Sequence, residues 1–339
     1  MIAALPTTAA PLLQITPDIY QVELPLPFAL RSVNCYLLRG SQGWTILDTG
    51  LNSRAGRAAW AAVFAVLGLE PGDVEQIVVT HIHPDHVGMA GWLQAHFRTS
   101  AKTPPVYLSP RSVEEVAKVW AAAATGDQAQ AAFFLRCGLD AETAQAAVTE
   151  MGPMRQAVQP LPTAVQIMQP GGRVRLGERQ FQVIHAPGHS DGQMIFYDPA
   201  DRLMLCADQV LMRISPNISI WPSTEPSPLR RYLASLEELA QLDVDLALPG
   251  HGVLIEEWAA RLQGIAEHHR VRLEEMVAAV VQPSTVAEIS RQVFNHDRLS
   301  THEVRFAVTE TLAHLCYLVE DGRLAQDTGA DGVMCFGRG

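Results

Sequence analysis

The feature that most limits what this chain can fold into is a run of four potential metal ligands within six residues, His81-Ile82-His83-Pro84-Asp85-His86. The apolar segment 76–80 precedes this run and predicts a short buried strand, so the cluster should lie at a strand end. Imidazole and carboxylate groups together suit Zn, Fe or Mn, and a catalytic site keeps one coordination position open for water or substrate. A polar loop with chance histidines is the alternative interpretation, and the close spacing argues against it.

Strand and helix patterns divide the chain before residue 256 into two similar halves. The first half begins with β-rich segments between residues 19 and 47, followed by a helix that Asn52 or Ser53 could cap and that ends near Leu67. The second half is expected to contain a helix over about 229–241 and strands near 174–176, 182–185, 194–197, 203–206 and 246–248. The alanine-rich residues 111–151, broken near Gly126 and Gly138, separate the halves and predict a helical insertion over the site. Two similar halves without a repeat of roughly 20 to 50 residues favour a four-layer α/β sandwich.

The pattern changes after residue 256, so we expect a catalytic domain over residues 1–256 and a smaller domain over residues 257–339. The smaller part predicts a long amphipathic helix to Val281, a shorter helix after Ser284 or Thr285, a third over 301–320, and two strands between 323 and 336. This order indicates a small helical, winged-helix-like domain. We interpret it as a structural or oligomerising appendage, which leaves a homodimer open.

The charge balance disfavours a polyanionic partner. The chain has 36 acidic and 25 basic residues and a formal net charge of −11, and from Trp258 onward it has eleven acidic residues against eight basic ones. Because nucleic-acid binding needs a basic surface that neutralises phosphates, no nucleic-acid partner is expected. No stretch reaches the roughly 18 uninterrupted apolar residues of a membrane span, so no membrane partner is expected either.

Cysteine usage and the N-terminal residues favour a cytoplasmic protein. The five cysteines are widely scattered, form no Cys-x-x-Cys pair and mostly lie in apolar strings, which is typical of buried thiols in a reducing compartment. The segment from Met1 to Leu13 has no basic region and is interrupted by Pro6 and Pro11, so we do not expect a secretory signal peptide there.

Four further motifs accompany the histidine cluster in a regular order. They are Ile46-Leu47-Asp48-Thr49-Gly50, His185-Ala186-Pro187-Gly188-His189-Ser190, Cys206-Ala207-Asp208 and Leu248-Pro249-Gly250-His251-Gly252. Together with Thr80-His81-Ile82-His83-Pro84-Asp85-His86-Val87-Gly88, this series resembles the motifs of the metallo-β-lactamase superfamily over roughly residues 18–255. The resemblance implies an α/β fold, the four-layer αββα metallo-β-lactamase sandwich, here followed by the winged-helix-like domain.

The resemblance also implies a ligand set for two divalent metal ions, with zinc preferred and iron or manganese as alternatives. One metal would be held by His81, His83 and His189, the second by Asp85, His86 and His251, and Asp208 would bridge them.

Two residues of these motifs are given other roles. Asp48 is expected either to orient a ligand histidine or to serve as a turn residue at the strand end. His185 is expected to make an ordinary hydrogen bond, because the Pro187-Gly188 turn brings His189 toward the metals. The remaining histidines have no ligand spacing and are interpreted as surface or core residues; they are His96, His268, His269, His296, His302 and His314.

The implied activity is that of a binuclear metal-dependent hydrolase whose nucleophile is a metal-bridging hydroxide. Asp208 would fix the metal spacing, and Asp85 would orient the hydroxide or pass a proton to the leaving group, so these two carboxylates are the expected catalytic residues. Ser190 has no base at a suitable spacing, which makes a Ser-His-Asp mechanism a weak alternative.

The substrate is expected to be a small molecule, namely an ester, lactone or thioester that is uncharged or bears an acyl group. The pocket wall is predicted to come from the insertion and from residues 213–228. No lysine follows Lys118 and no tyrosine follows Asp208 closely, which counts against glyoxalase-II-like and quorum-quenching lactonase activities. Two alternatives stay open. One is a metal-dependent phosphodiesterase or single-strand endoribonuclease, and the other is a non-catalytic binding protein that retains the fold.

Overall fold

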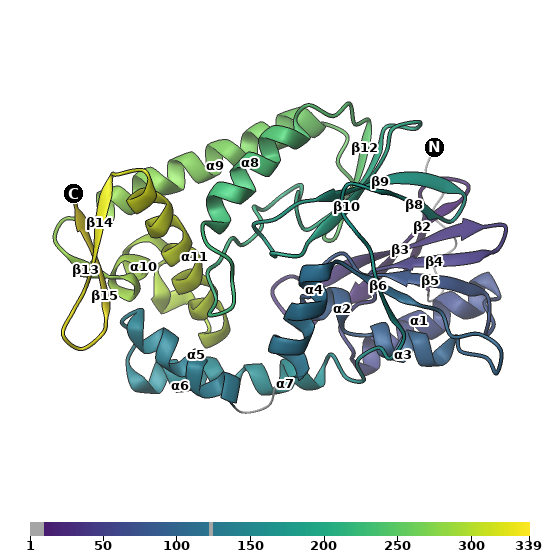
Figure 1. The fold of residues 1–339 in the computed structure, drawn as a ribbon, viewed down its shortest axis with the longest axis horizontal. Helices are drawn as coiled ribbons and strands as arrows, with labels where there is room; N and C mark the ends of the chain where they lie inside the picture. Colours follow the sequence, from purple (N-terminus) through teal and green to yellow (C-terminus); the bar gives the residue numbers. More distant parts are fainter. Residues whose placement is uncertain (1–9, 122–124) are drawn as a thin grey trace.

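The computed structural model describes residues 10–121 and 125–339 (Figure 1). The expectation about a signal peptide falls largely on residues 1–9, and the break expected near Gly126 adjoins residues 122–124; both stretches lie outside the described residues. Within the described part, no helix combines the length and the apolar character needed to cross a membrane.

The first sheet has seven strands in the order of the sequence and is mixed. Its strands are β1 (Leu12–Gln14), β2 (Ile19–Pro25), β3 (Ser32–Gly40), β4 (Gly43–Leu47), β5 (Val74–Val78), β6 (Val106–Leu108) and β7 (Val165–Ile167). Strands β1 to β4 pair antiparallel, whereas β4 to β7 pair parallel. The parallel part brings the carboxyl ends of β4 and β5 to one edge, where the chain continues into Asp48 and the histidine cluster.

The second sheet has five strands in the order β12-β11-β10-β9-β8. They are β8 (Arg173–Leu176), β9 (Arg179–His185), β10 (Met194–Asp198), β11 (Leu203–Ala207) and β12 (Leu246–Pro249). Only β11 and β12 pair parallel among these strands, so their carboxyl ends also lie together. The strands expected in the second half are thus confirmed.

Four layers result, because each sheet buries both of its faces. On β3, Tyr36 and Leu38 pack between the sheets with Phe196 and Leu205 of the second sheet. Side chains alternate along a strand, so the other face of the first sheet packs on helices α1 (Arg54–Leu67) and α3 (Ala90–His96). The outer face of the second sheet packs on α8 (Pro228–Leu239) and α9 (Trp258–Ala279) (Figure 1). The expected αββα sandwich is therefore confirmed.

The alanine-rich segment between the halves is helical in the structure. Its elements are α4 (Pro110–Glu115), a π-helical stretch η1 (Val116–Ala121), α5 (Thr125–Arg136), α6 (Ala141–Thr149) and α7 (Met151–Gln156). Near the sheets, the indole of Trp120 donates a hydrogen bond of 2.8 Å to the carbonyl of Ile82, inside the histidine cluster. At the far end, the amide of Ala287 donates to Cys137 O at 2.9 Å, so the segment also packs against the C-terminal helices (Figure 1).

The C-terminal part consists of α9, β13 (Ser284–Thr285), α10 (Val286–Phe294), a 3-10 turn η2 (His296–Arg298), α11 (Thr301–Glu320), β14 (Leu324–Thr328) and β15 (Met334–Arg338). Its strands form a small antiparallel sheet in the order β13-β15-β14. Capping boxes start both later helices, with Thr285 paired to Glu288 and Ser300 to Glu303. This is the winged-helix-like arrangement that the sequence predicts.

Candidate metal centre

Five loops at the same end of the two sheets form the site, four with the predicted ligands and one with Asp48. Asp48 follows β4, the histidine cluster follows β5, His189 follows β9, Asp208 follows β11, and His251 follows β12. Ligand sites in α/β folds form outside the carboxyl ends of parallel strands, and β4–β5 and β11–β12 are parallel pairs here. The short helix α2 (Pro84–Val87) carries Asp85 and His86 into the same space.

All seven predicted ligands fall into two adjacent groups. The potential ligand atoms of the first group, and likewise those of the second, lie within 4.8 Å of one another; the groups are His81, His83, His189 and Asp208, and Asp85, His86 and His251. Oδ2 of Asp208 lies 3.5 Å from Nε2 of His189, which belongs to the first group. The same oxygen lies 3.4 Å from Nε2 of His86 and 3.3 Å from Nε2 of His251, which belong to the second. Asp208 therefore stands where a ligand shared by two ions would stand.

The local structure fits divalent cations. Nε2 of His86, Nε2 of His189 and Oδ1 of Asp208 are buried without a hydrogen-bond partner among the described residues. Buried polar atoms nearly always have a partner, so three unsatisfied atoms in one place indicate a missing ligand. The backbone of Gly250 lies against the ligand side chains, because a Cβ at this position would be 2.1 Å from Oδ1 of Asp208 and 2.8 Å from Cε1 of His86. The donor set suits two divalent ions of the borderline or hard type and does not choose among them.

Each imidazole that faces Asp208 with Nε2 uses its other nitrogen to contact an oxygen acceptor. Nδ1 of His86 lies 2.8 Å from Oδ2 of Asp48, and Nδ1 of His251 lies 2.7 Å from the carbonyl of Ser32. Such bonds set the tautomer that leaves Nε2 free for a metal. Asp48 also accepts from the amide and the hydroxyl of Thr80, both at 2.8 Å, and has a left-handed backbone with φ of 59°. It is both the orienting residue and the turn residue that the sequence allowed.

Asn217 and Asn34 hold the ligand loops through contacts that were not predicted. Nδ1 of His189 lies 3.0 Å from the carbonyl of Asn217, and the side-chain amide of Asn34 donates to Pro249 O at 3.1 Å and to Gly252 O at 2.9 Å, on either side of His251. The role of Asn34 could have been inferred from the sequence, because a buried amide within the apolar strand β3 must find hydrogen-bond partners. The role of Asn217 could not, because it contacts His189 through a backbone carbonyl, which every residue type has.

Electrostatics divides the histidines into two kinds. Burial holds the pKa of His81 well below its usual range, and burial likewise lowers the pKa of His83 to about 3, so both are neutral imidazoles ready to bind a metal. Burial is the largest single influence on His86 and His251 and opposes their charge, but the neighbouring carboxylates together outweigh it: Asp208 and Asp85 act on both rings, and Asp48 acts on His86 as well. The pKa of His86 is raised well above its usual range, and the pKa of His251 is raised to about 10. Metal binding at this second group must therefore release protons.

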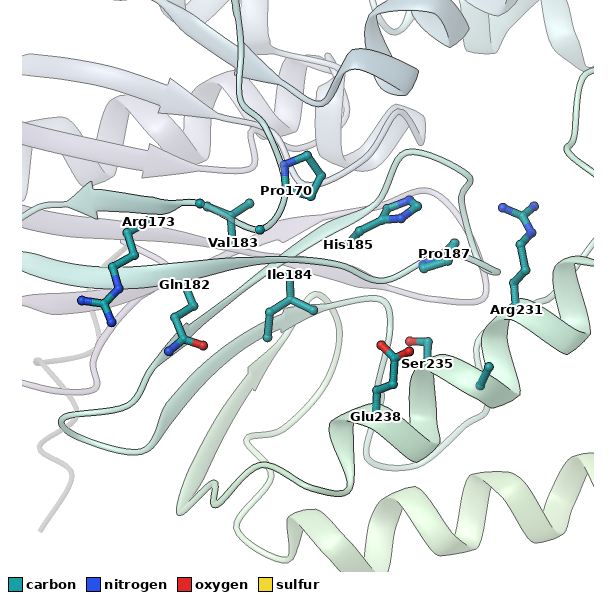
Figure 2. Close-up of a pocket in the computed structure, with 13 residues that line it drawn as sticks. Pro170, Arg173, Gln182, Val183, Ile184, His185, Pro187, Arg231, Ser235 and Glu238 are labelled. Atoms are coloured by element: carbon teal, nitrogen blue, oxygen red, sulfur yellow. The ribbon is translucent and has the colours of Figure 1, made fainter.

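His185 lies outside the cluster, as expected. Its Nε2 is 2.8 Å from the carbonyl of Asp191, and neither ligand group includes it. Figure 2 shows it lining an open cavity of about 820 Å³ between β9 and α8, together with Pro187, Ser235 and Glu238. None of the seven predicted ligands lines that cavity, so its size says nothing about the metal centre.

The fold and this paired cluster define a class of protein, the metal-dependent hydrolases built on an αββα sandwich. Residues 29–251 match the family described as "Metallo-beta-lactamase superfamily", and residues 273–339 match "Metallo-beta-lactamase-like, C-terminal domain". The chain belongs to the metallo-β-lactamase superfamily and is a metal-dependent hydrolase.

Three similar proteins illustrate the relationship. A crystal structure of a metallo-beta-lactamase family protein from Thermus thermophilus aligns with a TM-score of 0.85 and 31% identity, over 96% of this chain and 100% of that one. The "Probable metallo-hydrolase YqjP" of Bacillus subtilis is 24% identical over 88% of this chain and 92% of its own. The "Acyl-coenzyme A thioesterase MBLAC2" of Gallus gallus is 28% identical over 64% of this chain and 72% of its own.

Proposed function

We propose that the protein hydrolyses an ester, lactone or thioester of a small acyl-bearing molecule, with two divalent ions held by the seven clustered residues. The observation that supports this most is the position of Asp208, whose Oδ2 lies within 3.5 Å of an imidazole nitrogen from each ligand group. When bound, a pair of divalent ions lowers the pKa of water to near neutrality and polarises a carbonyl oxygen. The similarity to an acyl-coenzyme A thioesterase supports the choice of a thioester or related acyl compound.

The two carboxylates at the centre are suited to different tasks. The side chain of Asp208 is only 8% exposed and is surrounded by imidazoles, so it holds position and charge. The side chain of Asp85 is 20% exposed, so a substrate can reach it, and Nε2 of His251 lies 3.3 Å from its Oδ2. Burial opposes ionisation of Asp85, but the positive charges of His86 and His251 lower its pKa to about 2. Asp85 is therefore ionised and within reach of a substrate, which suits it to orienting the attacking water or to passing a proton to the leaving group.

The loops that carry Asp208 and His251 continue into exposed apolar side chains, which we propose as contacts for an acyl group. Met212 and Ile214 follow Asp208 in the sequence and remain 36% and 46% exposed, and Val253, two residues after His251, is 47% exposed. Arg261 holds the first of these loops, because Nη2 donates to the carbonyl of Ile214 at 2.7 Å. Apolar walls with a few placed polar groups are typical of small-molecule sites.

The proposal is tested with one substrate panel, run with Zn, Mn and Fe in turn. The panel contains neutral esters, lactones, thioesters, phosphodiesters and single-stranded RNA, and Asp208→Asn serves as the variant that should lose all turnover. We expect metal-dependent turnover of at least one acyl compound. Salt-sensitive RNA binding with metal-dependent cleavage, and no acyl hydrolysis, would instead identify the phosphodiesterase or endoribonuclease alternative. Metal binding without any turnover would identify the binding protein.

A further inference from the structure

Arg305, in the second turn of α11, is a buried guanidinium enclosed by aromatic rings. The residue is 5% exposed. Its Cζ lies 4.8 Å from the ring centre of Phe306 and 5.9 Å from that of Trp221. These rings are themselves in edge contact, with centres 5.8 Å apart. The residue therefore occupies an aromatic recess between α11 and the 213–228 segment.

The partners of this guanidinium are weak. Nη1 donates to the thioether sulfur of Met151 at 3.0 Å, Nη2 lies 3.1 Å from Nδ1 of His302, and Nε is buried with no partner among the described residues. In the described part of the chain, no carboxylate oxygen lies within 4 Å of it, and the charge of Glu150 acts on it only from farther away. Burial lowers the pKa of Arg305 to about 10, so the group is still a cation at neutral pH.

Two other partly buried arginines, Arg111 and Arg179, are compensated by carboxylates, whereas Arg261 donates to the backbone carbonyls of Leu211 and Ile214. Arg179 contacts Asp18, Asp198 and Asp201, and Arg111 contacts Asp191 at 3.1 Å. A buried charge without a counter-charge is costly, and a thioether and a neutral imidazole accept hydrogen bonds far more weakly than a carboxylate or phosphate does. An uncompensated guanidinium of this kind is what a site for an anion would contain.

A series of contacts links Arg305 to one side of the metal centre. The carbonyl of Asn217 contacts His189, and the side chain of Asn217 accepts from the hydroxyl of Ser219. The hydroxyl of Thr309, one helical turn after Arg305, contacts Ser219 Oγ at 3.0 Å and donates to Arg305 O at 2.9 Å.

A second series of contacts reaches the other side of the metal centre. The ring of His302 stacks on Phe28 with centres 5.4 Å apart. Phe28 lies in the β2–β3 connection, and this connection leads directly into Ser32, whose carbonyl contacts His251. Arg305 thus lies between the two loops that orient His189 and His251, the ligands from the second half of the chain.

We propose that Arg305 binds an anionic group of the substrate, a carboxylate or a phosphate, at a position remote from the bond that is hydrolysed. The inference rests on the proposed hydrolase function and narrows its substrate to an acyl compound with a negative charge, in place of the uncharged substrate that the sequence allowed. The anion replaces the Met151 thioether as the acceptor at Nη1 and also accepts from Nε, which has no partner among the described residues. Trp221 and Phe306 pack beside it and exclude water, which strengthens the ion pair.

The experiment compares Arg305→Gln with Arg323→Gln as the matched control. Arg323 lies in the same C-terminal part, but its side chain is 33% exposed and is paired with Glu274 at 2.8 Å. The first measurement needs no turnover and is the rise in Tm of the metal-loaded protein on adding a probe, since a ligand that binds the folded state raises Tm. The probe pairs are coenzyme A against N-acetylcysteamine for a phosphate, and succinamate against butyramide for a carboxylate.

The second measurement is the ratio of kcat/KM for an anionic and a neutral substrate of the same class. The pairs are acetyl-coenzyme A against S-acetyl-N-acetylcysteamine, and mono(4-nitrophenyl) succinate against 4-nitrophenyl butyrate. Losing hydrogen bonds to a charged group weakens binding about 10- to 100-fold, so we expect Arg305→Gln to lower the ratio by that factor for one pair. The same pair should lose its Tm shift, whereas Arg323→Gln should match the wild type in both measurements. The pair that responds identifies the anion.

Three outcomes separate this inference from the proposed function. If Arg305→Gln changes only the Tm without ligand and leaves the ratios and ligand-induced shifts at wild-type values, the residue is structural and the inference is wrong. If the wild type prefers neutral substrates and no anionic probe raises its Tm, the inference fails while the hydrolase proposal stands. If an anionic probe raises Tm in an Arg305-dependent manner but no acyl compound is hydrolysed, the anion site stands and the proposed function fails.

Discussion

Replacing Gly250 by alanine should disrupt the metal centre while leaving the fold intact. A Cβ at this position would lie 2.1 Å from Oδ1 of Asp208, whereas real Cβ atoms essentially never approach another heavy atom closer than 3.0 Å. The carboxylate must therefore retreat by the difference, about 0.9 Å, and metal–ligand distances tolerate only about ±0.2 Å. His86, 2.8 Å from the same Cβ through its Cε1, must move as well. A displacement near 1 Å can lower a catalytic rate about 100-fold.

The expected result for Gly250→Ala is loss of at least one metal per chain, with turnover reduced about 100-fold or more. Overpacking should cost about 1–3 kcal/mol of stability, which circular dichroism and thermal melting would register as a folded protein with a lower Tm. Gly264→Ala is the matched control, because Gly264 is exposed on α9 and, outside the helix backbone, the nearest atom to its Cβ would be Arg261 Nη1 at 3.9 Å. Elemental analysis that finds full metal content in Gly250→Ala, together with wild-type activity, would refute the steric reasoning.

Three further predictions concern the same centre. Asp48→Asn keeps a residue that tolerates the left-handed backbone but removes one hydrogen-bond acceptor from His86 or Thr80. Metal affinity should therefore fall about 10- to 100-fold in a chelator competition. An unchanged affinity would contradict the orienting role of Asp48. His189→Ala should lose metal and turnover while His185→Ala mainly lowers Tm, and the reverse order in elemental analysis would show the third motif to be wrongly assigned. Because the raised pKa of His251, about 10, keeps it protonated in the metal-free protein, metal affinity should increase as pH rises from about 6 to 8. Calorimetry in buffers of different ionisation enthalpy should then report released protons, and heats independent of the buffer would count against this.

Elements with strong local signals were the ones that the sequence predicted well. The third C-terminal helix was expected over 301–320 and α11 has those bounds, because the Ser300–Glu303 capping box marks its start within the chain itself. Ser53 caps α1 by accepting a hydrogen bond from the amide of Gly56, and Gly68 ends the helix in a left-handed conformation. Strands β1, β6 and β7 have three residues each, too few to show an alternating pattern, and only pairing within the sheet defines them.

The ligand set could be predicted because each ligand is a side chain within a short motif, and the structure brings all seven together. The acceptors that orient the ligand histidines could be predicted only where the acceptor is a side chain, as with Asp48. The acceptors for His189 and His251 are the backbone carbonyls of Asn217 and Ser32, which no residue type encodes. The uncompensated state of Arg305 depends on side chains from distant parts of the chain, such as Met151 and Trp221, so the sequence shows only a basic residue on a helix.

The number of metal ions bound per chain decides whether Asp208 is a shared ligand. Oδ2 of Asp208 lies within 3.5 Å of imidazoles from both ligand groups, so the chain is expected to bind two divalent ions. Elemental analysis of the purified protein, after removal of metal and reconstitution with Zn, Mn or Fe, should find about two ions per chain, and Asp208→Asn should bind fewer. A plateau at one ion per chain under every condition, or full occupancy without Asp208, would contradict the shared-ligand centre.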